Sequence, residues 1–298
     1  MSVPRWFSHS VLILFAIGSI MISGCSSSKP ALTATSRVAE GYGRAVNSYE
    51  KKDYDAAVLL LESLLFTSRA TALEDDVLFL LGKSYYYSGQ YMLASDMFTR
   101  LLRQMPSTPF ARTAQFMIAK SCEQLSAHFE LDQQYTSKAI EQFALYLDIY
   151  PVTDSAKVSS DLETYRSLLK LNPENQSYKQ NYATALAQFS RIDSVRYAAK
   201  AIPVLREKLA KNLFFIARQY VQLKKYKAAG IFYDELIKRY SDTVYVRQAW
   251  SGKIDVLVKR QKWFDAGQAL DQYLQLYPDQ KQQMHSVREQ IAKNFSKK

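Results

Sequence analysis

Residues 77–106 read VLFLLGKSYYYSGQYMLASDMFTRLLRQMP, and this stretch decides the fold. Its first half places Leu81, Gly82 and Tyr85 on one stripe at helical spacing, and its second half is apolar at the same spacing. Gly82 is small enough to let a second helix approach closely. Pro106 closes the stretch, because proline cannot continue a helix interior. The stretch therefore predicts two helices that pack against each other as a hairpin.

The second helix of this hairpin has counterparts along the chain. An aromatic residue is followed three residues later by alanine, and four residues after that by a bulky residue. The four segments are YDAAVLLLESLL (54–65), YMLASDMFTRLL (91–102), YKAAGIFYDELI (226–237) and WFDAGQALDQYL (263–274). Glycine and proline are few, 9 and 8 in 298 residues, which is typical of an all-α protein. Because one hairpin cannot bury its apolar face alone, the repeats predict a stacked α-solenoid.

These positions resemble the tetratricopeptide repeat, which has Leu, Gly or Ala, and Tyr on its first helix and Ala, an aromatic and a final Pro on its second. The resemblance implies about five hairpins. Their expected ranges are 38–71, 75–108, 112–151, 210–243 and 247–278, with Pro106, Pro151 and Pro278 closing the second, third and fifth. The third hairpin carries an insertion around 128–134. Residues 152–209 depart from the repeat phase and are either one degenerate repeat or an amphipathic insertion of two helices.

The N-terminus predicts export and a lipid anchor. A single basic residue, Arg5, precedes the apolar run 11–22, which is too short to span a bilayer. Ile22-Ser23-Gly24-Cys25 then resembles a bacterial lipobox, which implies a diacylglyceryl thioether on Cys25, cleavage before it and a further acyl chain on the new N-terminus. An uncleaved short anchor and an ordinary signal peptide are the alternatives. If Cys25 carries lipid, Cys122 has no disulfide partner and is expected to be a small buried hydrophobe.

These features divide the chain into six expected parts. They are a signal peptide (1–24), the acylated cysteine with a flexible tether (25–36), repeats one to three (37–151), the irregular segment (152–209), repeats four and five (210–278), and a closing helix with a basic tail (279–298).

Positive charge is concentrated in the second half of the chain. The net charge is +11, and residues 191–262 hold 17 Lys and Arg against 6 Asp and Glu. Export argues against nucleic acid as the partner of this basic block. Acidic lipid head groups and an acidic protein surface remain as partners, beside a solvated face with no partner at all.

Two segments resemble one family more closely than they resemble generic repeats. DQQYTSKAIEQFALYLDIYP (132–151) and LREKLAKNLFFIARQYVQLKKYKAAGIFYDELIKRY (205–240), together with the lipobox, are similar to the BamD family of outer-membrane lipoproteins. The resemblance implies a non-enzymatic component of the β-barrel assembly machinery, anchored in the outer membrane and facing the periplasm. It also implies two partners, a BamA-like barrel protein with POTRA domains and unfolded outer-membrane proteins that are recognised by a C-terminal signal ending in an aromatic residue.

The chain departs from the family in three places. Residues 152–204 are longer than the usual connection, and the fourth repeat ends at Ser241 rather than at proline. A basic residue that the family uses toward BamA aligns with Leu223, so Lys224 and Lys225 are expected to replace it.

A solenoid of this kind presents its first helices on the concave face. An aromatic groove there could hold a short apolar segment, and a lysine could meet a chain-terminal carboxylate. The groove candidates are Tyr49, Phe79, Lys83, Tyr86, Phe116 and Lys120. The alternative is that each aromatic is core between hairpins, which the register favours for Tyr49 and leaves open for Phe79 and Tyr86. The basic candidates for docking BamA are Arg218, Lys224, Lys225, Lys227, Lys238 and Arg239.

Catalysis has little support in the sequence. His128 and His285 have no neighbouring metal-ligand motif, and no nucleophile elbow or phosphate-binding glycine loop is present. We expect no enzyme activity, no cofactor and no metal. The main alternative function is that of another tetratricopeptide envelope lipoprotein, such as a pilus or secretin pilot or a cell-wall coordinator.

Overall fold

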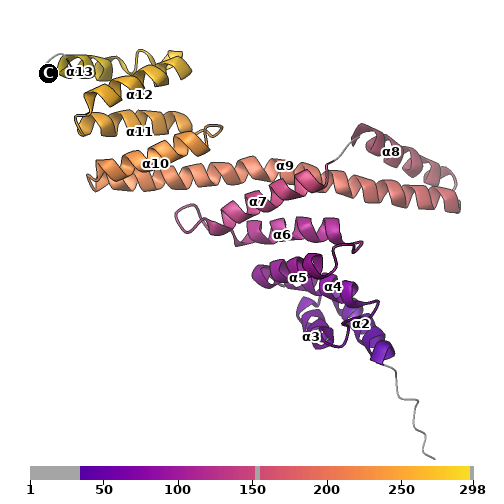
Figure 1. Ribbon diagram of the computed structural model, residues 1–298. Coiled ribbons are helices and arrows are strands. Elements are labelled where there is room, and N and C mark those ends of the chain that lie inside the picture. The colour runs from indigo at the N-terminus through magenta and orange to yellow at the C-terminus, as the bar shows by residue number, and fades with distance from the viewer. Residues whose placement is uncertain (1–33, 152–154, 296–298) are drawn as a thin grey trace, which may run out of the picture.

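The computed structural model describes residues 34–151 and 155–295, and within these ranges the chain forms helices and no strands (Figure 1). The all-α prediction is confirmed. The elements are α2 (Ala34–Glu50), α3 (Tyr54–Leu64), α4 (Glu74–Tyr87), α5 (Tyr91–Gln104), α6 (Ala111–Leu125), α7 (Gln134–Ile149), α8 (Ser155–Leu171), α9 (Gln176–Gln222), α10 (Tyr226–Arg239), α11 (Val246–Lys259), α12 (Trp263–Leu276), a 3₁₀ turn η1 (Pro278–Gln280) and α13 (His285–Phe295).

Five antiparallel hairpins are stacked as the repeats predict. They pair α2 with α3, α4 with α5, α6 with α7, the end of α9 with α10, and α11 with α12. Helix α13 packs on α12 as the expected closing helix. Helices α5, α7 and α12 each end two residues before Pro106, Pro151 and Pro278 respectively. In the described part of the chain, no helix is long and apolar enough to cross a membrane.

The turns inside four hairpins share one backbone conformation. A residue with positive φ follows the first helix, and the next N–H bonds back to a carbonyl of the last helical turn, as in a Schellman motif. The four residues are Lys52, Gly89, Lys224 and Gln261, with φ of 62°, 81°, 56° and 57°. Within each half of the molecule the two residues lie 37 residues apart, which is also the spacing of the repeated sequence segments.

Close helix packing follows from the alanine and aromatic positions. Ala57, Ala94, Ala229 and Ala266 are fully buried. A Cβ added to Gly82 would lie 2.8 Å from Cε1 of the buried Phe98, so only glycine lets α4 meet α5 in this way. The predicted role of Gly82 is confirmed.

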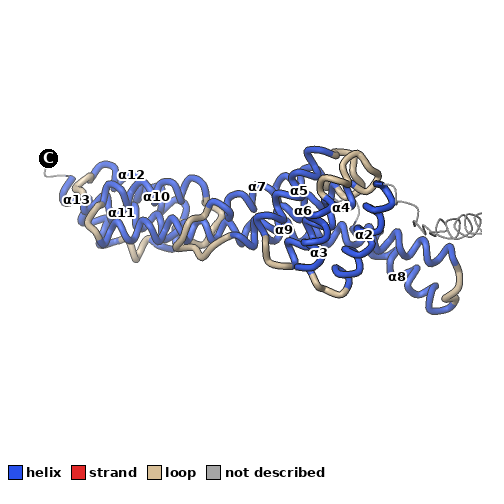
Figure 2. Tube along the Cα trace, turned by 90° about the horizontal axis from the view of Figure 1, so that it is seen from below, coloured by secondary structure: helices blue, strands red, loops and turns tan. Residues whose placement is uncertain are grey.

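The irregular segment forms two helices and not a further repeat. Helix α8 has no buried residue and pairs with the first part of α9 (Figure 2). Helix α9 has 47 residues and is about 70 Å long. It begins at the side-chain cap of Asn175, and Pro203 lies within it. Pro203 and Ala199, whose carbonyl loses its usual donor, both lie on the exposed face, where water can replace the bond.

Two helices run across expected boundaries. The division at 209/210 falls inside α9, because one helix serves both as the end of the insertion and as the first helix of the fourth hairpin. Similarly, α2 begins at Ala34, within the expected tether. No breaker stops the helix near residue 209, so repeat phase alone could not place the boundary.

Two hydrophobic cores meet on α9. The N-terminal core holds the first three hairpins and reaches Leu205, whereas the C-terminal core begins at Leu209. The loop made by the predicted insertion fixes this junction. Asn212 donates a hydrogen bond to the Phe129 carbonyl at 2.7 Å, and the Lys208 ammonium binds the Ser126 carbonyl at 3.0 Å and hydroxyl at 2.8 Å. The third hairpin's extra residues therefore clamp α9 in place.

Candidate functional site: an N-terminal groove and a C-terminal basic surface

Lys83 is the centre of the candidate groove. It lies on α4, half-buried, with its ammonium 4.6 Å from the ring centroid of Tyr49 and 5.6 Å from that of Phe79. Among the described residues no carboxylate lies within ion-pair distance of it. Cation–π contacts stabilise the ammonium without neutralising it. An anionic group could therefore pair with the Lys83 ammonium.

Phe79 is partly occupied by its neighbours. Its ring stacks on Phe110 at 4.3 Å and nearly parallel, at 6°, and meets the edge of Phe98 at 5.9 Å. One face of Phe79 thus belongs to the packing between hairpins. The Phe79 ring is only half-buried, and the Lys83 ammonium lies over it.

A cluster of tyrosines extends the groove toward the hairpin turns. Neighbouring ring centroids in the cluster are 5.3–6.1 Å apart, and its members are Tyr49, Tyr54, Tyr86, Tyr87 and Tyr91. Burial, and then the neighbouring Tyr54, raises the pKa of Tyr49 to about 12, so its phenol stays protonated at neutral pH. The sequence analysis missed Tyr54, Tyr87 and Tyr91, although Tyr54 and Tyr91 are the aromatic residues that begin the repeated segments.

The two candidates on the third hairpin are covered by α9. Tyr197 packs edge-on against Phe116, with centroids 5.8 Å apart. The Lys120 ammonium donates to Glu123 at 2.9 Å and to the Tyr197 hydroxyl, and that hydroxyl donates to Glu123 at 2.7 Å. Burial lowers the pKa of Lys120, but the bonds to Tyr197 and Glu123 outweigh it and raise the pKa overall. Lys120 is therefore already paired.

The expected groove is corrected accordingly. The remaining candidates lie on the first two hairpins, next to the mutually bonded side chains of Lys120, Glu123 and Tyr197, which we call the wall. Tyr86 lies near this wall. The charge of Lys120 therefore opposes the rise in the Tyr86 pKa that burial causes. The repeats could not reveal the wall, since Tyr197 comes from a helix outside the repeat pattern.

The six docking candidates do not form one surface. Lys224, Lys225 and Lys227 lie at the start of α10, in the turn that follows α9, whereas Lys238 and Arg239 lie at its other end. Lys227 and Lys238 are about 16 Å apart along the helix axis. Arg218 lies on α9, where its charge acts on the buried Tyr233.

Two arginines near the far end of α10, Arg239 and Arg206, are paired within the chain. Arg239 binds Glu235 at 2.9 Å. Arg206 forms a two-armed ion pair with Asp242 and donates to the Arg239 carbonyl at 2.8 Å. The hydrogen bond from Arg206 holds the pKa of Asp242 below its ordinary value. This end of the hairpin is engaged in holding the loop before α11.

The structure describes one of the two cysteines. Cys25 lies outside the described residues, so its lipidation stays a prediction. Cys122 is buried and free, as expected, and burial raises the pKa of its thiol. Within the described ranges, no group of three or more His, Cys, Asp or Glu side chains could hold a metal ion.

Comparison with known proteins points to the cell envelope. Residues 35–170 match the YfiO family, which is described as an outer membrane lipoprotein. This part of the chain is similar to outer-membrane lipoproteins. The match covers a little under half of the chain and includes the three N-terminal hairpins with the groove. Together with the stacked hairpins, it supports an envelope lipoprotein with tetratricopeptide-like repeats. No curated protein is similar enough to count as a match.

Solved structures with related helical arrays are distant. A tetratricopeptide repeat protein from Parabacteroides merdae is 14% identical over 86% of this chain and 98% of its own, with a TM-score of 0.33. The TPR2AB domain of yeast Sti1, solved with pHSP90, is 12% identical over 86% and 99%, with a TM-score of 0.31. Yeast Tom70 is 13% identical over 88% and 68%, with a TM-score of 0.31. With TM-scores this low, these structures say nothing about the function of this chain.

Proposed function

We propose that this chain is a BamD-like component of the machinery that assembles outer-membrane β-barrel proteins. It is held in the outer membrane by lipid on Cys25 and faces the periplasm. It supports a BamA-like barrel protein and receives unfolded outer-membrane proteins by their C-terminal signal. The match of residues 35–170 to an outer-membrane lipoprotein family supports the location.

The observation that carries the proposal is Lys83, which has no carboxylate partner among the described residues and lies over the rings of Tyr49 and Phe79. Tyr49, Phe79 and Tyr86 offer ring surface to an apolar or aromatic side chain. Lys83 offers an ammonium to the terminal carboxylate of the same ligand. The wall at Tyr197 favours a segment that ends in the groove over one that passes through it. A chain terminus with an aromatic last residue fits all three features.

Peptide binding tests the groove. A fluorescent peptide that ends in phenylalanine is titrated with the protein, and its anisotropy gives the affinity. We expect Phe79→Ala with Tyr86→Ala to weaken binding at least tenfold, on the order of the loss of one interface anchor. The matched control is Tyr220→Ala with Phe232→Ala, a stacked pair in the C-terminal half whose centroids are 5.4 Å apart. Unchanged affinity in the groove variant, with its helical signal intact, would remove the peptide-binding role.

The terminal carboxylate has its own test. Amidation of the peptide's C-terminus should weaken binding to the native protein but not to Lys83→Met, because the variant has no ammonium to lose. Equal losses in both proteins would assign the carboxylate to another group.

Co-purification tests the partner. The protein is isolated through a C-terminal tag from solubilised outer membranes, and the proteins that accompany it are identified. A stoichiometric barrel protein with POTRA domains is expected. A secretin, a pilus subunit or a cell-wall enzyme in its place would reassign the function to another class of envelope lipoprotein.

A further inference from the structure

The C-terminal half presents one edge rich in unpaired cations. The turn between α9 and α10 and the turn between α11 and α12 lie side by side, because α10 packs on α11. They carry five cations that we call the basic edge, namely Lys224, Lys225, Lys227, Arg260 and Lys262. Within the described ranges, none of the five is ion-paired. Their neighbour Lys259 differs, since it binds Asp255 at 2.7 Å.

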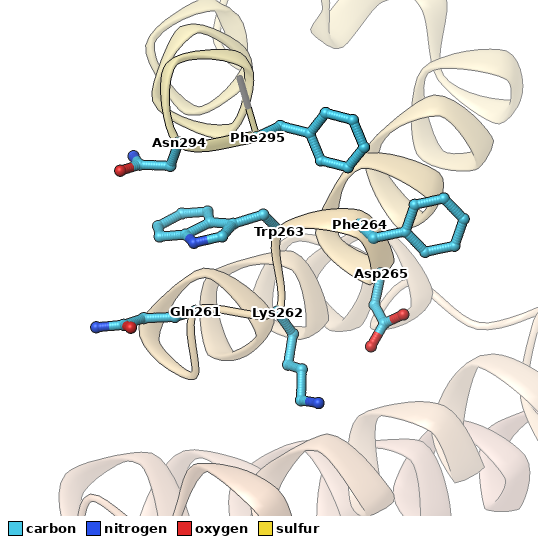
Figure 3. A pocket seen from close by; sticks show the side chains of 7 residues that line it. All are labelled: Gln261, Lys262, Trp263, Phe264, Asp265, Asn294 and Phe295. Carbon is cyan, nitrogen blue, oxygen red and sulfur yellow. The ribbon is translucent and has the colours of Figure 1, made fainter. Parts of the chain in front are cut away.

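Two shallow hollows adjoin along this edge. One is lined by Lys224, Lys225, Lys227 and Arg260, and the other begins at the next residue, Gln261. The second hollow lies between the start of α12 and the end of α13 (Figure 3). Its one acidic side chain is Asp265. Positive charge is thus concentrated in the first hollow, and the second adds Lys262 beside Asp265.

Large apolar side chains stand exposed on the same edge. Leu223 is 63% exposed, Ile231 59%, Phe264 60% and Phe295 56%. Figure 3 shows Phe264 and Phe295 pointing outward on the same side, and their rings stack at 6.4 Å. Within the described chain, no helix buries these four side chains.

Cations interleaved with exposed aromatic and aliphatic side chains suit a lipid surface. Head-group phosphates present diffuse negative charge that meets lysines wherever they lie, and the boundary with the acyl chains accepts apolar side chains. Lysine stems can lie along that boundary while their ammonium groups stay at the phosphates. An acidic protein would instead have to match each cation and each apolar group at a fixed position.

We propose that the basic edge rests on an anionic membrane surface, with its cations at the lipid phosphates and Leu223, Phe264 and Phe295 entering the head-group region. This contact is a second attachment, independent of lipid on Cys25. It does not require the peptide groove or the barrel partner. It would hold the C-terminal half against the bilayer that the N-terminal anchor already reaches.

Vesicle binding tests the proposal. The full chain carrying Cys25→Ser, which cannot be lipidated, is sedimented with vesicles of phosphatidylcholine mixed with phosphatidylglycerol, or of phosphatidylcholine alone. We expect binding to the mixed vesicles only, and weaker binding as salt is raised. Lys224→Glu with Lys225→Glu should lower the binding constant by more than tenfold, since each cation near an anionic surface contributes about fivefold.

The matched control is Lys238→Glu with Arg239→Glu, the same charge change at the other end of α10. It should lower binding only slightly. The apolar contribution is tested by Phe264→Ser with Phe295→Ser, which should weaken binding without changing its dependence on salt. Phe66→Ser, at an exposed phenylalanine of the N-terminal half, is the control for that pair.

Several outcomes would overturn the proposal. They are equal binding to both kinds of vesicle, equal losses in the two charge-reversal variants, and no binding at all. If the Lys224 and Lys225 variant keeps vesicle binding but loses the co-purified barrel protein, the basic edge is a protein docking site. The peptide assay is independent of these outcomes, so failure here leaves the proposed function standing.

Discussion

The N-terminal and C-terminal halves use one turn and one packing rule but carry different surfaces. In each half, two positive-φ residues lie 37 residues apart, and an alanine and a bulky residue pack each hairpin. Around the N-terminal turns, tyrosines gather at Tyr54, Tyr87 and Tyr91. Around the C-terminal turns, unpaired lysines take their place. The comparison teaches that the repeat specifies the scaffold, while the residues between the repeat positions specify what each half can bind.

The sharpest test of this division is whether the two cores unfold separately. Phe98→Ala should destabilise the N-terminal half by about 3–5 kcal/mol, because a fully buried ring leaves a cavity. The described tryptophans, Trp250 and Trp263, both lie in the C-terminal half. Urea unfolding should therefore show a shifted helical signal and an unshifted tryptophan signal. Tyr233→Ala, at the equivalent position of the C-terminal half, should shift the tryptophan signal instead. A common shift in both signals for either variant would show a single cooperative unit.

The junction between the halves should be the next most sensitive place. Asn212→Ala leaves the Phe129 carbonyl without its donor, which should cost about 1–3 kcal/mol. We expect hydrogen exchange to quicken in the loop 126–133 and at the middle of α9. Asn181→Ala, in the part of α9 that pairs with α8, is the control. Unchanged exchange in the loop would mean that Lys208 alone holds the clamp.

The shared turn predicts that removing a glycine at one turn destabilises the protein, whereas introducing a glycine at the equivalent turn does not. Gly89→Ala should cost about 1 kcal/mol, because φ of 81° disfavours a residue with a Cβ. Lys52→Gly, at the equivalent turn, should be neutral or slightly stabilising. Thermal unfolding of both variants measures the difference. A stabilising Gly89→Ala would contradict the proposed equivalence of the turns.

Acid should shift the balance between the halves, though by only a few tenths of a kcal/mol for groups this exposed. Burial, and then Asp75, raises the pKa of Asp76, so folding of the N-terminal half gains stability as pH falls through that raised value. The hydrogen bond from Arg206 lowers the pKa of Asp242, so its contribution is present above the ordinary value of 3.8 and is lost as pH falls through the lowered one.

Unfolding should be measured at neutral pH and again below pH 3.8. The C-terminal half, followed by the tryptophan signal, should lose stability relative to the N-terminal half. Asp242→Asn should remove the C-terminal part of that change and Asp76→Asn the N-terminal part. An acid response that neither variant alters would assign it to other carboxylates.

Sequence reasoning located much of the fold and part of the groove. The hairpins, the proline ends, the close approach at Gly82 and the buried Cys122 could be predicted, because each depends on residues adjacent in the chain or at helical spacing. Lys83, Phe79 and Tyr86 were proposed for the same reason, and their role in binding stays a prediction. Phe116 and Lys120 both contact Tyr197, which lies 77 residues after Lys120, and the repeats could not reveal that contact.

The sequence by itself determined the all-helical class, the repeat period and the uneven charge, because these follow from spacing and composition. The folded chain alone shows that α9 runs unbroken through both halves, that Tyr197 binds Lys120 of the third hairpin, and that Arg239 is ion-paired whereas Lys224 and Lys225, among the described residues, are not. Those features depend on which surfaces a long helix meets after folding. Such contacts join residues far apart in the chain, and local periodicity carries no information about them.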